Sequence, residues 1–305
     1  MATHNIIIDC DPGVDDAVAI LLALASPREI ELAGITTVAG NVPLARTEYN
    51  ARRICTLAGR EDIPVYAGCA RPMLESSGVG STVHGDDGLG GVLLPEPGFA
   101  LRPGHAVDFI IRAVLDAPGE ITLCPIGPLT NIALAIVKEP AIAGKIKQIV
   151  FMGGAAFCPG NVTPVAEFNI YADPWAAHIV LSAGIRQAMF GLDVTLQATI
   201  TAPYLDHLQS LGPRLAKIAA MMRGYQAGDP CLHDPCVIAW LIDPTLFDGV
   251  PGHAMVCHQE DALRGNTMVA IKARHLQKTP ANITLMTGVD RPRLLALLTE
   301  RLSHY

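Results

Sequence analysis

The sequence predicts an α/β protein with an open, mostly parallel sheet flanked by helices, that is, a Rossmann-like core. Short apolar runs alternate along the chain with longer segments of helical periodicity, as in repeated strand–helix units. Half of the 305 residues are hydrophobic and only 17% are charged, which suits parallel strands buried on both faces. In such sheets ligands bind beyond the carboxyl ends of the strands. We therefore expect a single domain, 1–305, with its active site at that edge.

The first part of the chain alternates strands and helices with one interruption. Strands are expected where apolar runs are bounded by turn residues, and helices where periodic segments follow capping or proline residues. In chain order the expected elements are a strand at 6–8, a helix at 17–24, a strand at 31–38, a helix at 43–57, a short strand at 63–66, a helix at 105–116, a strand at 120–126 and a helix after 131. The interruption, 71–102, is rich in Gly, Pro and Ser and is too long for an ordinary connection. Its core, 84–91, is expected to be a flexible flap over a site.

The second part continues the same pattern. The expected elements are a strand at 149–152, an irregular stretch at 155–172, a helix from Asp173-Pro174, a strand at 187–191, a mostly helical segment at 202–226, a helix introduced by 233–235, strands at 253–258, 267–273 and 282–286, and a closing helix at 291–303. The acidic run at 9–16 and residues Asn41, Ile126, Met152 and Asp193 all fall at carboxyl ends of these strands. We therefore expect them to converge on one site.

Charge and cysteine content exclude several classes of protein. The net charge is −7 and the isoelectric point is near 5.8, so nucleic acid and anionic membrane surfaces are poor candidates as partners. The N-terminus has no basic region, and the longest apolar run near it, 17–25, is too short to span a bilayer. The eight cysteines form no CxxC pair and lie mostly in apolar surroundings, as reduced thiols do. We expect a cytoplasmic protein.

The run from Asp9 to Asp16 places four carboxylates within eight residues, between the first predicted strand and the first predicted helix. Two like charges about 5 Å apart repel by about 3 kcal/mol at an effective dielectric constant near 20. A helix N-terminus stabilises an anion by only about 0.3–1 kcal/mol. Either several of these acids are protonated or a cation lies among them, and oxygen ligands favour Ca²⁺ or Mg²⁺.

A simpler interpretation is that Asp11 caps the helix, with Pro12 at the first helical position. It leaves Asp15 and Asp16 as ordinary acids of the first turn, and it does not explain why four acids gather beside an apolar strand. Zinc held by Cys231 and Cys236, which flank a His-Asp pair, is a weaker alternative because their spacing fits no standard zinc pattern.

Two other groups of residues could carry chemistry. Asp234 precedes a proline and can be a helix cap, as Asp173 and Asp243 are expected to be. Its neighbour His233 can exchange a proton near neutral pH, which leaves a catalytic role equally open.

The irregular stretch contains Asn161, Glu167 and Asn169, a set that can bind a polyhydroxylated ligand. Turn formation within the loop is the alternative. Met152 is more often a core residue than a ligand contact.

With these motifs in place, residues 9–17 resemble the N-terminal signature of the inosine-uridine-preferring nucleoside hydrolase family. The resemblance runs along nearly the whole chain. The further motifs, in matching order, are Asn41, the glycine loop with His84, Gly127-Pro128-Leu129-Thr130-Asn131, Met152-Gly153-Gly154, Glu167-Phe168-Asn169 and His233-Asp234-Pro235.

The resemblance implies a Ca²⁺-dependent enzyme that cleaves ribonucleosides to ribose and free base in nucleoside catabolism and salvage, as a homodimer or homotetramer. The implied metal ligands are the carboxylates of Asp11, Asp15, Asp16 and Asp234 and the backbone carbonyl of Ile126. Asp11 would also be the general base for the water held by calcium, and Asp9 would only support the site.

Further roles follow from the same resemblance. Asp15, Asn41 and Asn169 would bind the 2′- and 3′-hydroxyls, Asn161 and Glu167 the 5′-hydroxyl, and Met152 would line the ribose pocket. His233 would be the general acid at the leaving base, with His84 and Tyr225 as flexible closing elements near it. The acidic histidine favours pyrimidine-preferring or broad activity on uridine, cytidine and inosine, since Trp175 and Trp240 fall inside predicted helices.

Two alternative functions remain open. A Mg²⁺-dependent phosphohydrolase could use an Asp-x-Asp strand end, but no lysine lies at a later strand end to bind phosphate. A non-catalytic calcium-dependent nucleoside-binding protein would need the acidic cluster but not His233.

Overall fold

The computed structural model describes residues 3–74, 84–226, 228–259 and 262–305. Within these residues one sheet of nine strands has the order β3-β2-β1-β4-β5-β6-β9-β7-β8. Its strands are β1 (His4–Cys10), β2 (Ile30–Thr37), β3 (Val65–Ala67), β4 (Ile121–Pro125), β5 (Gln148–Met152), β6 (Gln187–Phe190), β7 (Phe247–Val256), β8 (Thr267–Ala270) and β9 (Ile283–Val289). The neighbouring strands β3, β2, β1, β4, β5, β6 and β9 all run parallel. Strand β7 pairs antiparallel with both β9 and β8. The predicted α/β fold is confirmed.

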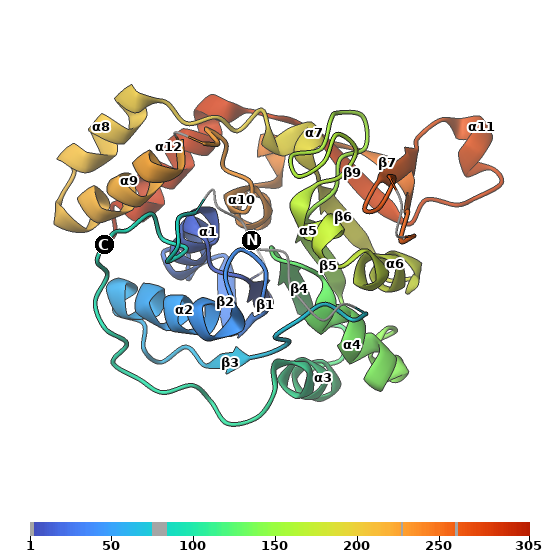
Figure 1. The fold of residues 1–305 in the computed structure, drawn as a ribbon, viewed down its shortest axis with the longest axis horizontal. Helices are drawn as coiled ribbons and strands as arrows, with labels where there is room; N and C mark the ends of the chain where they lie inside the picture. The colour runs from blue at the N-terminus through green and yellow to red at the C-terminus, as the bar shows by residue number, and fades with distance from the viewer. Residues whose placement is uncertain (1–2, 75–83, 227, 260–261) are drawn as a thin grey trace.

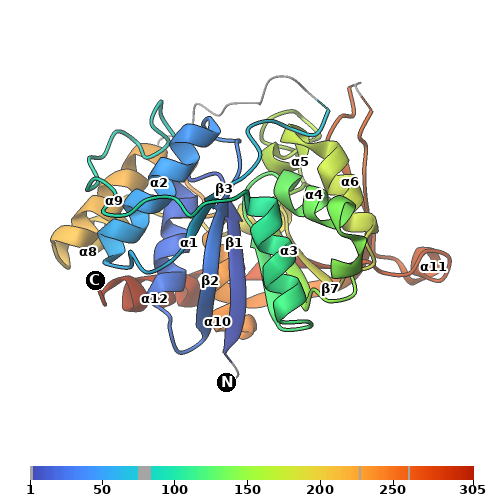
Figure 2. The ribbon, with the colours of Figure 1, turned by 90° about the horizontal axis from the view of Figure 1, so that it is seen from below.

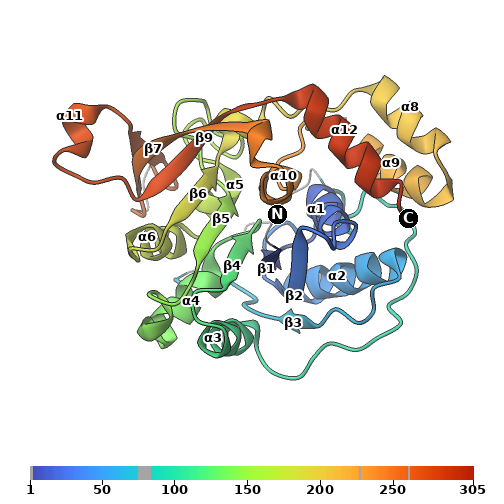
Figure 3. The ribbon, with the colours of Figure 1, turned by 180° about the vertical axis from the view of Figure 1, so that it is seen from behind.

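Helices cover both faces of this sheet (Figure 1). They are α1 (Val14–Leu24), α2 (Leu44–Ala58), α3 (Ala106–Asp116), α4 (Thr130–Lys138), α5 (Phe168–Ala172), α6 (Pro174–Ser182), α7 (Leu192–Thr195), α8 (Ala202–Ser210), α9 (Pro213–Gln226), α10 (Pro235–Ile242), α11 (Ala273–Leu276) and α12 (Arg291–Leu302), with 3₁₀ turns at Pro140–Ile142 and Pro244–Leu246. One face carries α1, α2, α9, α10 and α12, and the other carries α3, α4 and α6 (Figure 3).

The central strands are buried on both faces, as their continuous apolar sequences predict. Ile6 and Ile8 of β1 pack into the core under α1, whereas Ile7 between them packs into the core under α3 and α4. The alternation follows from the two-residue period of a strand. Two apolar cores therefore hold β1 rigidly, and its carboxyl end presents the acidic run to the edge of the sheet (Figure 2).

The long stretch 71–102 contains no helix or strand in its described residues, 71–74 and 84–102. It is tied to α2, because Asn50 donates hydrogen bonds to the carbonyls of Pro12 and Asp87, and Arg53 donates to those of Leu94 and Pro95. The predicted flap core, 84–91, is described and packs against these elements. Its flexibility stays a prediction, and residues 75–83 lie outside the described residues.

The prediction of an irregular stretch at 155–172 is wrong at its end, where α5 forms. Glu167 makes this helix possible, since its carboxylate accepts hydrogen bonds from the N–H groups of Asn169 and Ile170. Glutamate is not among the preferred N-cap residues, so the sequence contained no ordinary signal for this helix.

The described residues include no helix with the length and apolar character needed to cross a membrane.

Asp173 and Asp243 each cap a helix start, and the two positions form a matched pair for testing stability. Asp173 accepts from Ala176 N–H, and its buried carboxylate also accepts from the Thr130 hydroxyl and Met73 N–H. Asp173→Ala should therefore lower the free energy of unfolding by about 2–4 kcal/mol, the cost of a cap plus buried unpaired donors.

Asp243 lies nearer the surface and caps only a 3₁₀ turn. Asp243→Ala should cost about 1 kcal/mol. Urea unfolding of both variants measures the difference, and equal losses would show that the buried contacts of Asp173 contribute nothing.

Candidate active site

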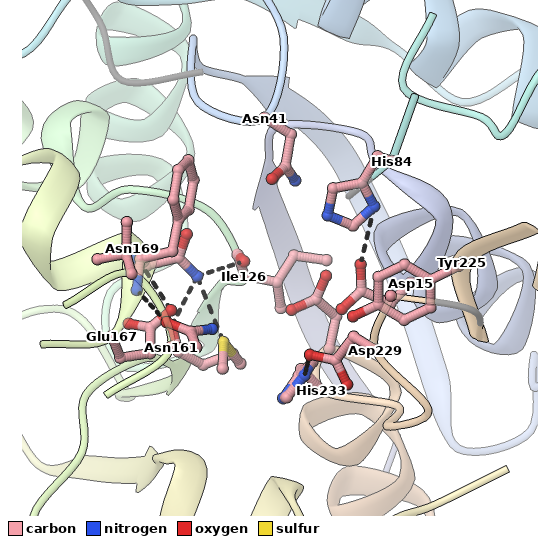
Figure 4. Close-up of a pocket in the computed structure, with 15 residues that line it drawn as sticks. Asp15, Asn41, His84, Ile126, Asn161, Glu167, Asn169, Tyr225, Asp229 and His233 are labelled. Atoms are coloured by element: carbon pink, nitrogen blue, oxygen red, sulfur yellow. Dashed lines mark hydrogen bonds and ion pairs between the residues drawn. The ribbon is translucent and has the colours of Figure 1, made fainter. Parts of the chain in front are cut away.

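A cavity of about 390 Å³ lies at the carboxyl ends of the strands (Figure 4). It is lined by Asp15, Asn41, His84, Ile126, Met152, Asn161, Val162, Glu167, Phe168, Asn169, Tyr225, Gly228, Asp229, His233 and Asp234. The predicted convergence is therefore observed for Asp15, Asn41, Ile126 and Met152. It is wrong for Asp193, which does not line the cavity and instead accepts hydrogen bonds from the N–H groups of Ala156 and Phe157. In Figure 4, Asn161, Glu167 and Asn169 lie on one side, and Asp15, His84, Tyr225, Asp229 and His233 lie on the other.

Three of the predicted carboxylates meet beside this cavity; Asp15 and Asp234 line it, whereas Asp16 is fully buried and does not. Asp15, Asp16 and Asp234 each place a carboxylate oxygen within 4.8 Å of the others, although Asp234 follows Asp16 by more than two hundred residues. All three are buried. Asp11 lies beside them, also buried, but it is not a member of this group and does not line the cavity.

The alternative that Asp11 caps the first helix is wrong. Helix α1 begins at Val14 with Gly13 as its N-cap, so Pro12 is outside the helix. Asp16 accepts the hydrogen bonds that this helix start needs, from Gly13 N–H at 2.9 Å and Asp11 N–H at 3.2 Å. Asp11 is free of that role, and its Oδ2 instead accepts from Asn41 N–H at 2.6 Å.

The Asp-Pro pairs that begin at Asp173, Asp234 and Asp243 differ in what their carboxylates do. Asp173 and Asp243 cap their helices, as expected. Asp234 makes no capping hydrogen bond with α10. Its carboxylate joins the acidic cluster instead, which removes the simpler interpretation for this residue.

Burial and mutual repulsion disfavour the ionised forms of these acids. Burial, with the charge of Asp15 added, raises the pKa of Asp16 to about 7. Burial and then the charge of Asp16 raise the pKa of Asp11 well above its ordinary value. The pKa of Asp234 is raised by burial and then by Asp15 and Asp16. A divalent cation among them would remove the repulsion and restore the ionised forms.

The residues present fit such a cation. The donors are hard carboxylate oxygens, as Ca²⁺ and Mg²⁺ require. Asp11 Oδ1 is buried without a hydrogen-bond partner among the described residues, so this oxygen is available to a cation. The Cβ of an alanine at Gly127 would lie 2.5 Å from this oxygen, and one at Gly40 would collide with Oδ2. Two glycines thus allow the close approach of backbone to the Asp11 carboxylate.

Asp9 supports the cluster from behind. Its Oδ1 accepts from the Thr36 hydroxyl at 2.6 Å and from Asn131 Nδ2 at 2.8 Å. Asn131 also donates to the Thr37 carbonyl, so it ties β1 to β2. Burial raises the pKa of Asp9 to about 7.

Amide side chains predicted to bind ribose hydroxyls line the cavity next to the acids. Asn41 donates to the Asp11 carbonyl and to Asp16 Oδ2, both at 3.3 Å. Asn169 donates to the carbonyls of Ile126 at 2.9 Å and Met152 at 3.2 Å. The Ile126 carbonyl, predicted to be a metal ligand, therefore accepts from Asn169 and keeps one lone pair for another partner.

Glu167 and Asn161 have structural partners in addition to their place on the cavity wall. Glu167 caps α5 and also accepts from Gly154 N–H at 2.8 Å. Asn161 accepts from Phe168 N–H at 3.0 Å. The turn-forming role considered for this loop is therefore real. Burial raises the pKa of Glu167.

His84 and Tyr225 form a wall of stacked rings, with centroids 5.0 Å apart and planes 16° apart. His84 Nδ1 accepts from Val14 N–H at 3.1 Å, so its proton is on Nε2. The same nitrogen lies 3.9 Å from Asp15 Oδ1. We do not regard this contact as an ion pair, because burial lowers the pKa of His84 and its Nδ1 lone pair is already used.

His233 has a partner at each ring nitrogen, and neither partner was identified from the sequence. Nδ1 lies 2.8 Å from the Thr195 hydroxyl and Nε2 lies 3.0 Å from Asp229 Oδ2. Burial lowers the pKa of His233, but the hydrogen bond and charge of Asp229 outweigh it, so the pKa is raised. Burial raises the pKa of Asp229, but its hydrogen bonds and the charge of His233 together outweigh burial, so this pKa is lowered overall. The i, i+4 spacing of Asp229 and His233 was the available signal.

The zinc alternative gains no support. Cys231 and Cys236 are both free thiols, and among the described residues the only cluster that could hold a metal is the acidic one. Cys236 instead donates its thiol hydrogen to the carbonyl of Leu232, which precedes α10.

Comparisons with known proteins agree along the whole chain. The model of a family described as "Inosine-uridine preferring nucleoside hydrolase" matches residues 6–296. The pyrimidine-specific ribonucleoside hydrolase RihA of Photobacterium profundum is 42% identical over 315 residues, covering 99% of this chain and 100% of the relative. An uncharacterized protein of Schizosaccharomyces pombe is 46% identical over 309 residues, covering 98% of each chain.

Two solved structures share the fold and more than 30% of the sequence. A purine-preferring ribonucleoside hydrolase from Gardnerella vaginalis has 36% identity and a TM-score of 0.91, with 98% of each chain covered. A plant nucleoside hydrolase has 33% identity and a TM-score of 0.93, with 100% of each chain covered.

The close packing around Asp11 predicts how glycine substitutions act on stability. Gly40→Ala and Gly127→Ala should each lower the free energy of unfolding by about 1–3 kcal/mol, because the added methyl group must displace a buried carboxylate. Gly144→Ala is the matched control, since a Cβ there meets nothing within 4 Å. It should leave stability unchanged or raise it by about 0.4–1 kcal/mol. Thermal or urea unfolding measures all three; a neutral Gly40→Ala would contradict the packing.

Proposed function

This chain belongs to the inosine-uridine preferring nucleoside hydrolase family and is a hydrolase acting on ribonucleosides, and we propose that it is Ca²⁺-dependent and cleaves the N-glycosidic bond to release ribose and free base. The observation that carries the proposal is the buried acidic cluster formed by Asp11, Asp15, Asp16 and Asp234 beside amide side chains. Carboxylates bind the cation, and amides bind sugar hydroxyls.

In this proposal Asp11, Asp15, Asp16 and Asp234 hold calcium together with the Ile126 carbonyl. The oxygen-only donor set and its mixture of side-chain and backbone ligands suit calcium better than zinc. When bound, the ion lowers the pKa of the attacking water and orients the sugar. Asp15, Asn41 and Asn169 bind the 2′- and 3′-hydroxyls, and Asn161 and Glu167 bind the 5′-hydroxyl. Met152 lines the sugar pocket.

Two residues carry out the proton transfers of the reaction. Asp11 takes a proton from water as the water oxygen bonds to C1′ of the ribose. The C1′–N bond breaks with its electron pair passing to the base, and His233 supplies the proton that the base takes up. Carboxylate and amide oxygens around the sugar stabilise the positive charge that develops on the ribose as this bond breaks.

We also propose a preference for pyrimidine nucleosides, with broader tolerance extending to inosine. Pyrimidine-specific relatives cover the whole chain at 42% identity, whereas the purine-preferring structural relative is 36% identical. Neither tryptophan lines the cavity, because Trp175 packs against His258 and Trp240 against Phe190. The base would meet His84 and Tyr225 instead.

The first test is ribose release from uridine, cytidine, inosine and adenosine, with and without a chelator. Uridine and cytidine should have the highest kcat/KM. Chelation should abolish activity, and added calcium should restore it. Asp11→Ala should lower turnover of every nucleoside by roughly 10³–10⁴-fold, the scale for loss of a catalytic group. Asp116→Ala is the control, since Asp116 is an exposed acid outside the site.

Other outcomes would identify the alternative functions. Release of inorganic phosphate from phosphate esters without ribose release from nucleosides would indicate a phosphohydrolase. Calcium-dependent nucleoside binding without turnover would indicate a binding protein. Activity unaffected by exhaustive chelation would contradict the metal assignment.

The second test addresses His233 as the general acid. His233→Ala should lower uridine turnover by about 10²–10⁴-fold, the usual contribution of an acid catalyst. Hydrolysis of 4-nitrophenyl riboside should change little, because nitrophenolate leaves without a proton. Steady-state kinetics on both substrates measures the ratio. A wild-type rate on uridine would contradict the assignment, and an equal loss on both substrates would show that His233 does not protonate the leaving group.

A further inference from the structure

We propose that Asp229 and Thr195 are positioning residues that hold the His233 imidazole by its two ring nitrogens, with Nε2 on the side of the ring that faces the base end of the cavity. This inference rests on the proposed function and assigns the two residues that make His233 usable there. It starts from the observation that both ring nitrogens of one buried histidine are occupied by partners of different chemistry.

Both partners can accept a hydrogen bond from the ring. An ionised carboxylate only accepts hydrogen bonds, so Asp229 accepts from Nε2–H. The Thr195 hydroxyl can donate or accept, so it suits Nδ1 with or without a proton. The imidazolium, the form that a general acid must have before it gives up a proton, therefore has an acceptor at each ring nitrogen. The two hydrogen bonds together fix the orientation of the ring.

The cavity lies on the Nε2 side of the ring. Asp229 lines the cavity, and its side chain keeps 21% exposure. Thr195 is fully buried and does not line it. A base bound against His84, Tyr225 and Gly228 would therefore approach the Nε2 proton, and the hidden Nδ1 would only anchor the ring.

Backbone hydrogen bonds make this arrangement rigid. Residues 198–200 pair with 230–232, through Leu232 N–H to the Ala198 carbonyl and Ile200 N–H to the Pro230 carbonyl. The segment that carries Asp229 and His233 is thereby fixed to the chain that follows Thr195. Asp229 Oδ1 also accepts from Cys231 N–H at 2.9 Å, which orients its carboxylate with Oδ2 toward His233.

In the reaction the departing base replaces Asp229 as the acceptor of the Nε2 proton of the imidazolium and takes that proton while its bond to C1′ breaks. The imidazole is then neutral and keeps its Nδ1 proton toward Thr195, and Nε2 regains a proton from solvent before the next turnover. Loss of the orienting groups should therefore slow only substrates whose leaving group needs that proton. This selectivity distinguishes positioning from a general structural role.

The test compares uridine with 4-nitrophenyl riboside in two matched substitutions. Asp229→Asn keeps the side-chain shape but allows an N–H to face Nε2. Thr195→Val removes the hydroxyl while keeping the shape, and Thr195→Ser, which keeps the hydroxyl, is its control. Asp229→Asn and Thr195→Val should each lower kcat for uridine by about 10- to 100-fold, as losses of orienting hydrogen bonds do. KM and nitrophenyl riboside turnover should stay within about threefold, and Thr195→Ser should resemble the wild type.

A double variant adds a separate criterion. Asp229→Asn combined with His233→Ala should be no slower on uridine than His233→Ala alone, since residues that act through one another are not additive. Equal losses on both substrates, additive losses, or full uridine activity in Asp229→Asn would each overturn the inference. Failure of the proposed function is distinct from these outcomes, because the wild-type protein would then release ribose from neither substrate.

Discussion

The structure depends on the burial of several carboxylates at one edge of a parallel sheet. Asp11, Asp15, Asp16 and Asp234 are all at most 5% exposed, and burial combined with like-charge repulsion raises the pKa of three of them. A cluster of this kind is unfavourable to folding unless something offsets the charge. Packing of β1 between two apolar cores stabilises the fold despite this repulsion. The proposed cation would neutralise the repulsion and occupy the site that the carboxylates form.

The two sides of the cavity differ in chemistry. One side carries Asn161, Glu167 and Asn169, and the other carries Asp15, the rings of His84 and Tyr225, and the Asp229–His233 pair. His84 comes from the long stretch before α3, Tyr225 from the end of α9, and Asp229 and His233 from the loop before α10. A parallel sheet makes this division possible, because strand ends distant in the sequence converge on one edge while the loops vary around them.

The sequence was sufficient for the fold and for most residues that line the cavity. Short apolar runs bounded by turn residues predicted the strands, and the motif around Asp11 located the acidic cluster. The sequence did not predict side chains whose structural role is unusual for their residue type or position. Glu167 caps α5 although glutamate seldom caps helices, and the cap expected from Asp11 is replaced by contacts of Asp16. Thr195 could not be predicted as a partner of His233, because its hydrogen bond joins two segments 38 residues apart and no local pattern reveals such a contact. Asp229 left only the weak signal of its i, i+4 spacing from His233.

The most direct measurement of the central claim is a crystal structure of the protein with calcium and ribose bound. The account predicts one ion between Asp11, Asp15, Asp16 and Asp234, at the 2.3–2.6 Å distances typical of calcium and oxygen. The Ile126 carbonyl should be among its ligands, and the ribose 2′- and 3′-hydroxyls should lie beside Asp15, Asn41 and Asn169. Ribose bound in the cavity with no ion among these acids, or calcium bound elsewhere, would contradict it.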